Sequence, residues 1–164
     1  MHLQLVVFDF ETFFNEEYSL TKKMTTEEYL RHSWFHVHGG GLKRAPKQTQ
    51  WITHKLLPPT LQAIDWASTA LLGHHLQFDA AILAWHYGIV PARYIDTLAM
   101  ASLLFGPSQS VSLENLAKKF GLSAKNVPYD LFKGMRELDP VTEQRVAVGC
   151  CRDECAHDPF REAE

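Results

Sequence analysis

The chain has 164 residues, of which 46% are hydrophobic and 21% charged, and its formal net charge is −3. This length suits one well-buried domain spanning 1–164, and the net charge argues against an extended cationic surface that coats nucleic acid. No run approaches the ~18 apolar residues of a membrane span, and the first ten residues lack the features of a signal peptide. We therefore expect a soluble, cytoplasmic protein.

The first third of the chain carries three segments with the composition of β-strands. They are "LQLVVFDF" at 3–10, "FHVHGGGL" at 35–42 and "TQWIT" at 49–53. Residues 5–8 of the first segment form a continuous apolar run, which is typical of a strand buried on both faces. Between the first two, Thr25 followed three residues later by Glu28 is a capping-box signature that predicts a short helix. The glycines of the second segment are not followed by the Gly-Lys-Ser/Thr of a phosphate-binding loop.

The middle of the chain alternates between strand and helix signals. "ALLGHH" at 70–75 predicts a short strand, and a helix follows from about Asp79 with Gly88 as its stop. A second helix is predicted to begin near Asp96 and to end at Gly106.

The last third is predicted to be helical apart from a loop at 122–138. Ser112 is the predicted cap of an amphipathic helix that ends at Gly121. The apolar stripe of that helix consists of Leu113, Leu116, Ala117 and Phe120. Asp139 and Pro140 occupy the N-cap and first position of a final helix. This order of elements predicts an α/β sheet flanked by helices.

Two carboxylates follow the apolar part of the first strand. On a strand, residues i and i+2 share a face, so Asp9 and Glu11 project together while Phe8 and Phe10 point to the other side. Two adjacent carboxylates repel each other unless a cation lies between them, and hard oxygens are the ligands that Mg²⁺ or Mn²⁺ prefers. The alternative is a strand end that simply reaches solvent.

Two further acids are candidates to join this pair. Asp79 lies where a strand enters a helix, a position that the helix dipole alone would also favour. Asp153 lies late in the final helix on or beside an apolar stripe, and its alternative is a solvated acid next to Arg152 and Glu154.

The ordered segments "VVFDFET", "GHHLQFDAAIL", "IDTLAMA", "SLENLAKKFGL" and "GCCRD" resemble the DEDD (DnaQ-like) superfamily of 3′-5′ exonucleases. The resemblance covers nearly the whole chain and is closest to the proofreading domain of phage family A DNA polymerases. It implies an RNase-H-like fold with a mixed five-stranded sheet flanked by helices. It also implies hydrolysis of single-stranded or frayed DNA from the 3′ end, with release of nucleoside 5′-monophosphates. A phage origin would place the protein in the host cytoplasm.

The resemblance implies a site for two divalent ions, Mg²⁺ or Mn²⁺. Its catalytic and metal-binding residues would be Asp9, Glu11, Asp79 and Asp153. One ion would lower the pKa of the attacking water and the other would stabilise the leaving 3′ oxygen. Asp9 would bridge the two ions, and Glu11 could also accept a hydrogen bond from the terminal 3′-hydroxyl.

The resemblance also implies residues that contact nucleic acid. Thr12 and Phe13 would lie near the terminal nucleotide, where aromatic rings favour single strands by stacking on bases. His75 occupies the position of the family's motif II asparagine, and Lys125 is a candidate for a neighbouring phosphate. The partner is expected to be single-stranded DNA or a DNA 3′ end, with RNA and an associated DNA polymerase left open.

The third motif departs from the family pattern. Where the tyrosine subgroup orients the attacking water, this chain has Gly149, four residues before Asp153. A register shifted by one residue would make Glu154 the ligand and put Cys150 in place of the tyrosine. His157 could reach the site from the following turn.

Two alternatives to an active exonuclease stay open. One is a catalytically weakened domain that binds nucleic acid or docks onto a polymerase, and the other is an RNase-H-like scaffold without a metal site. A separate question concerns the three cysteines, all within "GCCRDECAHD", which together with His157 could bind zinc or could be ordinary core cysteines. Their crowding argues against a disulfide framework.

Overall fold

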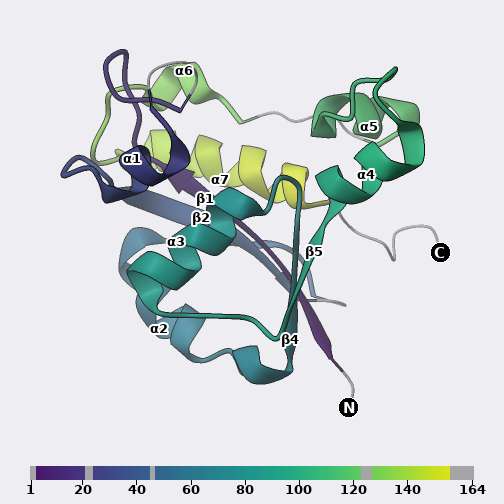
Figure 1. Cartoon of the computed structure of the whole chain (residues 1–164). Coiled ribbons are helices and arrows are strands. Elements are labelled where there is room, and N and C mark those ends of the chain that lie inside the picture. The colour runs from purple at the N-terminus through teal and green to yellow at the C-terminus, as the bar shows by residue number, and fades with distance from the viewer. Residues whose placement is uncertain (1–2, 21–23, 45–46, 123–126, 156–164) are drawn as a thin grey trace.

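The computed structural model describes residues 3–20, 24–44, 47–122 and 127–155, with side chains as far as Cys151. Its centre is a five-stranded sheet with the strand order β3-β2-β1-β4-β5 (Figure 1). The strands are β1 (Gln4–Thr12), β2 (Val37–Arg44), β3 (Gln50–Thr53), β4 (Thr69–Gly73) and β5 (Arg93–Asp96). β1 pairs with β2 in antiparallel orientation and with β4 in parallel orientation. The predicted α/β fold with a mixed five-stranded sheet is confirmed.

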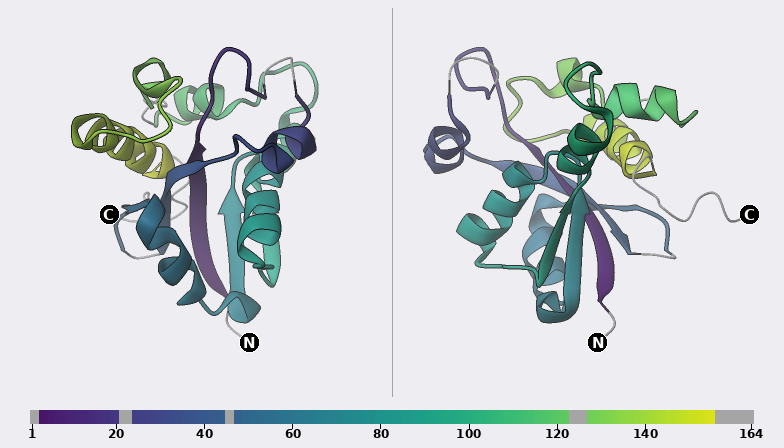
Figure 2. Two further views of the ribbon diagram at one scale, coloured as in Figure 1. Left: turned by 90° about the vertical axis from the view of Figure 1, so that its left-hand side faces the viewer. Right: turned by 45° about the vertical axis from the view of Figure 1, so that its right-hand side comes forward.

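Helices cover both faces of the sheet. In chain order they are α1 (Thr26–Arg31), η1 (His54–Leu56), α2 (Leu57–Gln62), η2 (Trp66–Ser68), α3 (Gln77–Tyr87), α4 (Thr97–Phe105), α5 (Leu113–Lys119), α6 (Tyr129–Phe132) and α7 (Pro140–Cys155). Helix α7 lies on one face and helix α3 on the opposite face (Figure 2). Within the described residues, none of the helices combines the length and the apolar composition needed to cross a membrane.

Each face of the sheet has its own apolar cluster. On the α3 face, Phe8 and Phe10 of β1 pack with Leu61 of α2 and Ile82 of α3. The α7 face has a smaller cluster, formed by Val127, Phe132, Val146 and Cys150 with Trp51 packed against them. Burying these side chains contributes about 1.5–3 kcal/mol for each large apolar residue. The larger cluster therefore dominates the stability of the sheet.

The predicted helix caps are present. The Thr25 hydroxyl accepts a hydrogen bond from the Glu28 amide, and the Glu28 carboxylate accepts one from the Thr25 amide, so the capping box closes. Asp139 accepts hydrogen bonds from the amides of Val141 and Thr142 at the start of α7. Each cap satisfies amides that a helix leaves without an internal partner.

Several elements differ from the sequence prediction. The first helix of the middle region begins at Gln77, two residues before Asp79. Helix α2 was not predicted because its Pro58 and Pro59 break helical patterns, although proline is tolerated in a first turn. The expected loop at 122–138 contains the four-residue helix α6.

The apolar stripe predicted for α5 is only partly buried. Ala117 is buried at 2% exposure, whereas Phe120, which follows the last helical residue, is 58% exposed. Phe120 instead lies beside Phe105 of α4, with ring centroids 6.3 Å apart. A stripe read from periodicity therefore overestimates burial where a helix stands away from the sheet, as α4 and α5 do in Figure 1.

The glycine run of β2 allows close packing rather than phosphate binding. A Cβ atom added to Gly40 would lie 2.6 Å from the ring of Phe8 and 2.8 Å from the carbonyl oxygen of Asp9. Both distances are shorter than a carbon atom tolerates, so a side chain at Gly40 would push β2 away from β1. The run therefore brings β2 close to the strand that carries the two acids.

Candidate functional site

The two carboxylates of β1 lie on the face of the sheet that α7 covers. Asp9 is partly buried and Glu11 is 5% exposed, while Phe8 and Phe10 point into the core on the opposite face. β1 pairs with β4 over Gln4–Val7 and with β2 over Val6–Thr12, and this pairing fixes the direction of each side chain. The predicted alternation of acids and phenylalanines is confirmed.

Cys150 of α7 approaches this pair from the neighbouring layer. One carboxylate oxygen of Asp9, one of Glu11 and the Sγ atom of Cys150 all lie within 4.8 Å of one another. Gly149, where the resemblance in the sequence leads us to expect a water-orienting tyrosine, is buried one residue earlier in the same helix. The residue that α7 presents to the acids is therefore Cys150, for which the sequence left open three roles: the tyrosine position in a shifted register, a zinc ligand or a core cysteine.

Asp79 is held next to the pair by the backbone of β1. Its Oδ1 atom accepts a hydrogen bond of 3.0 Å from the amide of Phe10, and the side chain is 5% exposed. Phe10 lies between Asp9 and Glu11, so this bond ties the start of α3 to the segment that bears both acids. Among the described ligand atoms, Asp79 is not part of the 4.8 Å set that contains Cys150.

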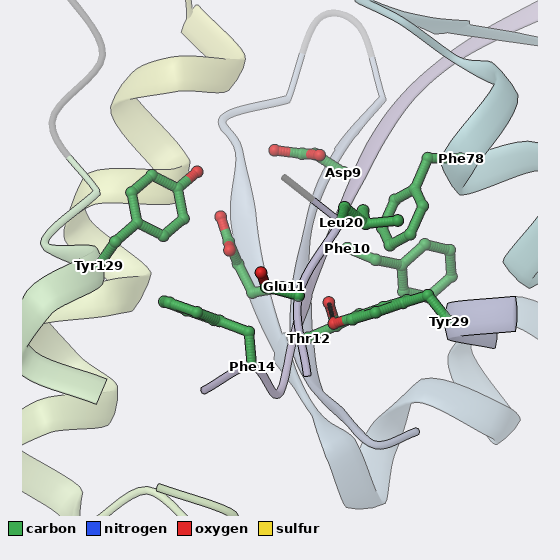
Figure 3. Close-up of a pocket in the computed structure, with 10 residues that line it drawn as sticks. Asp9, Phe10, Glu11, Thr12, Phe14, Leu20, Tyr29, Phe78 and Tyr129 are labelled. Atoms are coloured by element: carbon green, nitrogen blue, oxygen red, sulfur yellow. Dashed lines mark hydrogen bonds between the residues drawn. The ribbon is translucent and has the colours of Figure 1, made fainter. Parts of the chain in front are cut away.

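A cavity of about 380 Å³ opens beside the two acids. Its walls are formed by Asp9, Phe10, Glu11, Thr12, Phe14, Ser19, Leu20, Tyr29, Phe78 and Tyr129. In Figure 3, Phe14 and Tyr129 lie on one side of the carboxylates, and Leu20, Phe78 and Tyr29 lie on the other. A volume of this size, with aromatic walls and a few polar groups, is typical of a small-molecule site.

Thr12 and Tyr29 form a fixed hydrogen-bonded wall of this pocket. The Tyr29 hydroxyl donates to the carbonyl oxygen of Phe13 at 2.6 Å and lies 2.8 Å from the Thr12 hydroxyl. Because a tyrosine has one proton to donate, Thr12 is the donor in the second bond. Burial raises the pKa of Tyr29 to about 12, and the negative charge of Glu11 adds to the rise, so the phenol stays protonated at neutral pH.

Phe14 and Tyr129 are pocket residues that the sequence did not indicate. Tyr129 comes from α6, within the predicted loop, and its ring meets Phe14 edge-on at 6.2 Å. Phe14 also meets Phe132 of α6 at 5.5 Å. In Figure 3 the hydroxyl end of Tyr129 points to the side where the Glu11 carboxylate lies. No local motif marks either residue, because Phe14 and Tyr129 are far apart in the sequence and come together only in the folded chain.

Two predicted nucleic-acid contacts lie away from the pocket. Phe13 is 6% exposed and stacks on Tyr18 at 5.9 Å within the core, so its neighbour Phe14 lines the pocket instead. His75 is exposed in the turn after β4 with a φ of 64°, and its amide donates to Asp96. Asp96 also accepts from the Leu98 amide, so the turn and the start of α4 share one carboxylate.

The remaining predicted residues lie outside the described side chains. Asp153 and Glu154 belong to α7, three and four residues after Cys150, but only their backbone is described. Lys125 and His157 fall outside the described residues altogether. Their roles stay predictions.

The chain matches a family model described as 3′-5′ exonuclease over residues 53–144, which is more than half of its length and includes Asp79. No curated protein sequence matches it. The structure resembles Brucella melitensis NrnC bound to pGG, with 15% identity and a TM-score of 0.64, covering 94% of this chain and 70% of NrnC. NrnC with bound Mg²⁺ is 14% identical, with a TM-score of 0.63, and the match covers 94% of this chain and 70% of NrnC. Escherichia coli RNase D, an exoribonuclease involved in structured RNA processing, is 14% identical, with a TM-score of 0.58, and the match covers 92% of this chain and 36% of RNase D. These likenesses show an RNase-H-like fold.

Proposed function

The chain belongs to the 3′-5′ exonuclease family, and from this premise we propose that it is a metal-dependent nuclease that shortens single-stranded or frayed DNA from the 3′ end. The products are nucleoside 5′-monophosphates. The observation that carries the proposal is the pair Asp9 and Glu11, held on one face of a central strand beside an aromatic cavity of about 380 Å³. The fold and the family support nuclease activity, and the two carboxylates support the location of the active site.

The donor set fits a divalent cation. Asp9 and Glu11 offer hard carboxylate oxygens that come within 4.8 Å of each other. Ligand bonds of about 2.0–2.2 Å to one ion would close that separation with small side-chain shifts. Glu11 is 5% exposed, and a nearby cation stabilises the charge of a buried carboxylate.

The proposed ligands are Asp9, Glu11, Asp79 and a carboxylate of α7. Bound Mg²⁺ or Mn²⁺ ions would lower the pKa of the attacking water and stabilise the leaving 3′ oxygen. Asp9 and Glu11 are held rigidly because β1 is paired with β2 along this stretch. Asp79 is tied to the Phe10 amide, which keeps its carboxylate beside the same strand.

The pocket would receive the terminal nucleotide. The rings of Phe14, Phe78 and Tyr129 offer faces on which a base can stack, worth about 1–3 kcal/mol per base. Stacking favours an unpaired 3′ end because a paired base keeps its ring against its neighbours. Thr12 lines the same cavity, and its hydroxyl donates to Tyr29.

The position of Cys150 bears on which acid of α7 completes the site. With 3.6 residues per turn, position 154 falls within about 40° of Cys150 around the helix, and position 153 within about 60° on the other side. Asp153 remains our proposed ligand, and Glu154 is its direct competitor. Separate Asp153→Ala and Glu154→Ala variants decide between them, because only loss of the true ligand abolishes Mn²⁺ binding measured by calorimetry.

The test uses the full chain with 3′-overhang and single-stranded oligonucleotides labelled at the 5′ end. Matched DNA and RNA versions of one sequence are incubated with Mg²⁺ or Mn²⁺, and products are resolved by length. We expect stepwise shortening that Asp9→Ala abolishes and that EDTA stops. Shortening of RNA alone would move the substrate class from DNA to RNA. Binding without shortening at high protein concentration would overturn the exonuclease proposal.

A second candidate is a weakened exonuclease-like domain that binds single strands or docks onto a polymerase. Gly149 favours it, since this buried helix position has no side chain to orient water. The two candidates differ in turnover but share nucleic-acid binding. Fluorescence anisotropy with a labelled single strand measures the binding that both candidates predict. The cleavage assay on the same protein separates them, because only an active exonuclease shortens the strand.

A further inference from the structure

Cys150 is the described residue of α7 that reaches the two acids of β1. Its Sγ atom, one oxygen of Asp9 and one oxygen of Glu11 lie within 4.8 Å of one another. Cys150 has no exposed surface, and Glu11 is 5% exposed. Across the part of the chain that the structure describes, this is the one set of three or more His, Cys, Asp or Glu ligand atoms that comes so close.

We propose that the Cys150 thiolate is a third protein ligand at the Asp9 and Glu11 site, which makes this site take thiophilic divalent ions such as Zn²⁺, Co²⁺ and Cd²⁺ more tightly than Mg²⁺. The inference rests on the proposed function, because it assigns a ligand at the same site. It goes beyond that function because an all-carboxylate site contains no sulfur.

The chemistry follows from the mixture of hard and soft donors. Mg²⁺ prefers oxygen ligands in near-octahedral geometry, whereas Zn²⁺ and Cd²⁺ gain from a thiolate. Three protein ligands leave a fourth position of a tetrahedral ion open for water or a phosphate oxygen, as in catalytic zinc sites. The Cys150 thiol would release its proton to solvent when the ion binds.

The surroundings of Cys150 also explain why a cation belongs there. On one side the residue packs with Val127, Phe132 and Val146, which is ordinary for a core cysteine. On the other side it lies beside two carboxylates, and one oxygen of each comes within 4.8 Å of its Sγ atom. A divalent cation at the centre of these three atoms would be within reach of a ligand from each residue.

The experiment needs a chain in which Cys150 is the sole cysteine. The sequence has three cysteines, so the full chain with Cys151→Ser and Cys155→Ser serves as the parent. Co²⁺ is titrated into this metal-free parent and into the same chain with Cys150→Ser added. We expect a thiolate-to-cobalt charge-transfer band in the parent that saturates at one ion per chain. We expect Cys150→Ser to lose the band and to bind Co²⁺ at least tenfold more weakly. Asp9→Asn in the parent should also weaken binding at least tenfold.

A band that persists without Cys150, or an unchanged Co²⁺ affinity in Cys150→Ser, would overturn the proposal. Circular dichroism verifies that the serine variant is folded. If it is not, X-ray absorption spectroscopy of the Zn²⁺-loaded parent gives the answer without that variant. A zinc–sulfur distance of about 2.3 Å supports the ligand, and a shell of oxygen and nitrogen alone overturns it.

The cleavage assay in Mg²⁺, run on the same proteins, keeps the two proposals apart. A Cys150-dependent cobalt band in a chain that cleaves no oligonucleotide refutes the exonuclease and upholds the thiolate ligand. Cleavage that depends on Asp9, in a chain that binds Co²⁺ without sulfur, upholds the exonuclease and refutes the ligand.

Discussion

The two faces of strand β1 are built from alternate residues of one segment, yet they differ in almost every physical respect. On the α3 face, Phe8 is 1% exposed and Phe10 is 4% exposed, and their rings meet at 4.5 Å in a closed apolar core. On the α7 face, Asp9 and Glu11 border a cavity and a thiol. Neighbouring positions therefore have different roles, because alternation sends the phenylalanine rings to a packed core and the two carboxylates to the border of an aromatic-walled cavity.

Asp9→Asn should abolish catalysis while leaving the fold intact. The change keeps the size of the side chain but removes one negative charge, so metal-dependent cleavage should fall about a thousandfold or more. The free energy of unfolding should stay level or rise slightly, because repulsion between the two carboxylates is relieved. Cleavage rates and urea unfolding of the same preparation test both parts.

Retained cleavage by Asp9→Asn would show that the reacting site lies elsewhere. A large loss of stability would show that Asp9 is structural, and the two faces of β1 would then be alike. Ser68→Ala is a control away from the site, since Ser68 is the last residue of η2, before β4 begins, and its hydroxyl donates to Asp65.

Phe8→Ala should produce the opposite pattern. Removing a buried ring leaves a cavity and costs about 3–5 kcal/mol of unfolding free energy. Cleavage per folded molecule should change little at temperatures where the variant is folded, because the ring points away from the acids. Urea unfolding and an activity assay corrected for the folded fraction measure the two effects. A fall in corrected activity as large as that of Asp9→Asn would contradict the separation of the two faces.

Strand β1 also shows which features of the fold the sequence alone could predict. The alternation of Phe8, Asp9, Phe10 and Glu11 predicted both faces because strand periodicity is local. The cap at Thr25 was predictable for the same reason, since its partner Glu28 is three residues away. Sequence patterns therefore predict features whose interacting residues are close together along the chain.

Elements that depend on distant contacts escaped prediction. Strand β5 has four residues with Arg93 and Tyr94 exposed, so it shows no apolar pattern and exists because β4 pairs with it. Tyr129 and Cys150 reach the acids of β1 only because α6 and α7 pack on that face. The family pattern pointed to Gly149, and one residue of helical register decides which side chain faces the acids.

His38 makes the α7 face sensitive to acid. Its ring is 3% exposed and meets Phe132 edge-on, and within the described structure its Nε2 atom is buried without a hydrogen-bond partner. Burial lowers the pKa of His38 to about 4, and the nearby His36 and His54 add to the effect. An unfolded chain takes up this proton near pH 6.5 while the folded chain stays neutral. Stability is therefore complete above pH 6.5 and falls as the pH drops toward 4.

Because the unfolded chain takes up this proton, we expect the free energy of unfolding to fall by roughly 3 kcal/mol between pH 7.5 and pH 4. His38→Gln removes the titrating group and should flatten that part of the pH dependence, which urea unfolding at several pH values measures. Burial also lowers the pKa of His36, so a smaller acid-dependent loss should remain in the variant. Equal pH dependence in both proteins would contradict the assignment to His38.

Tyr129→Phe gives the smallest expected effect and tests whether the Tyr129 hydroxyl, in the wall of the cavity, orients the attacking water. The variant keeps the ring that meets Phe14 at 6.2 Å, so stacking and folding should be preserved. Loss of one hydroxyl that hydrogen-bonds a charged group or its water costs about 1.5–3 kcal/mol, or roughly tenfold to a hundredfold in turnover. If Tyr129 orients the attacking water, kcat falls by this factor while KM for a single strand stays constant. If it only stacks on the base, Tyr129→Phe leaves kcat and KM unchanged and Tyr129→Ala raises KM. In that case the Tyr129 hydroxyl takes no part in the reaction, and the carboxylates are the catalytic groups of this face.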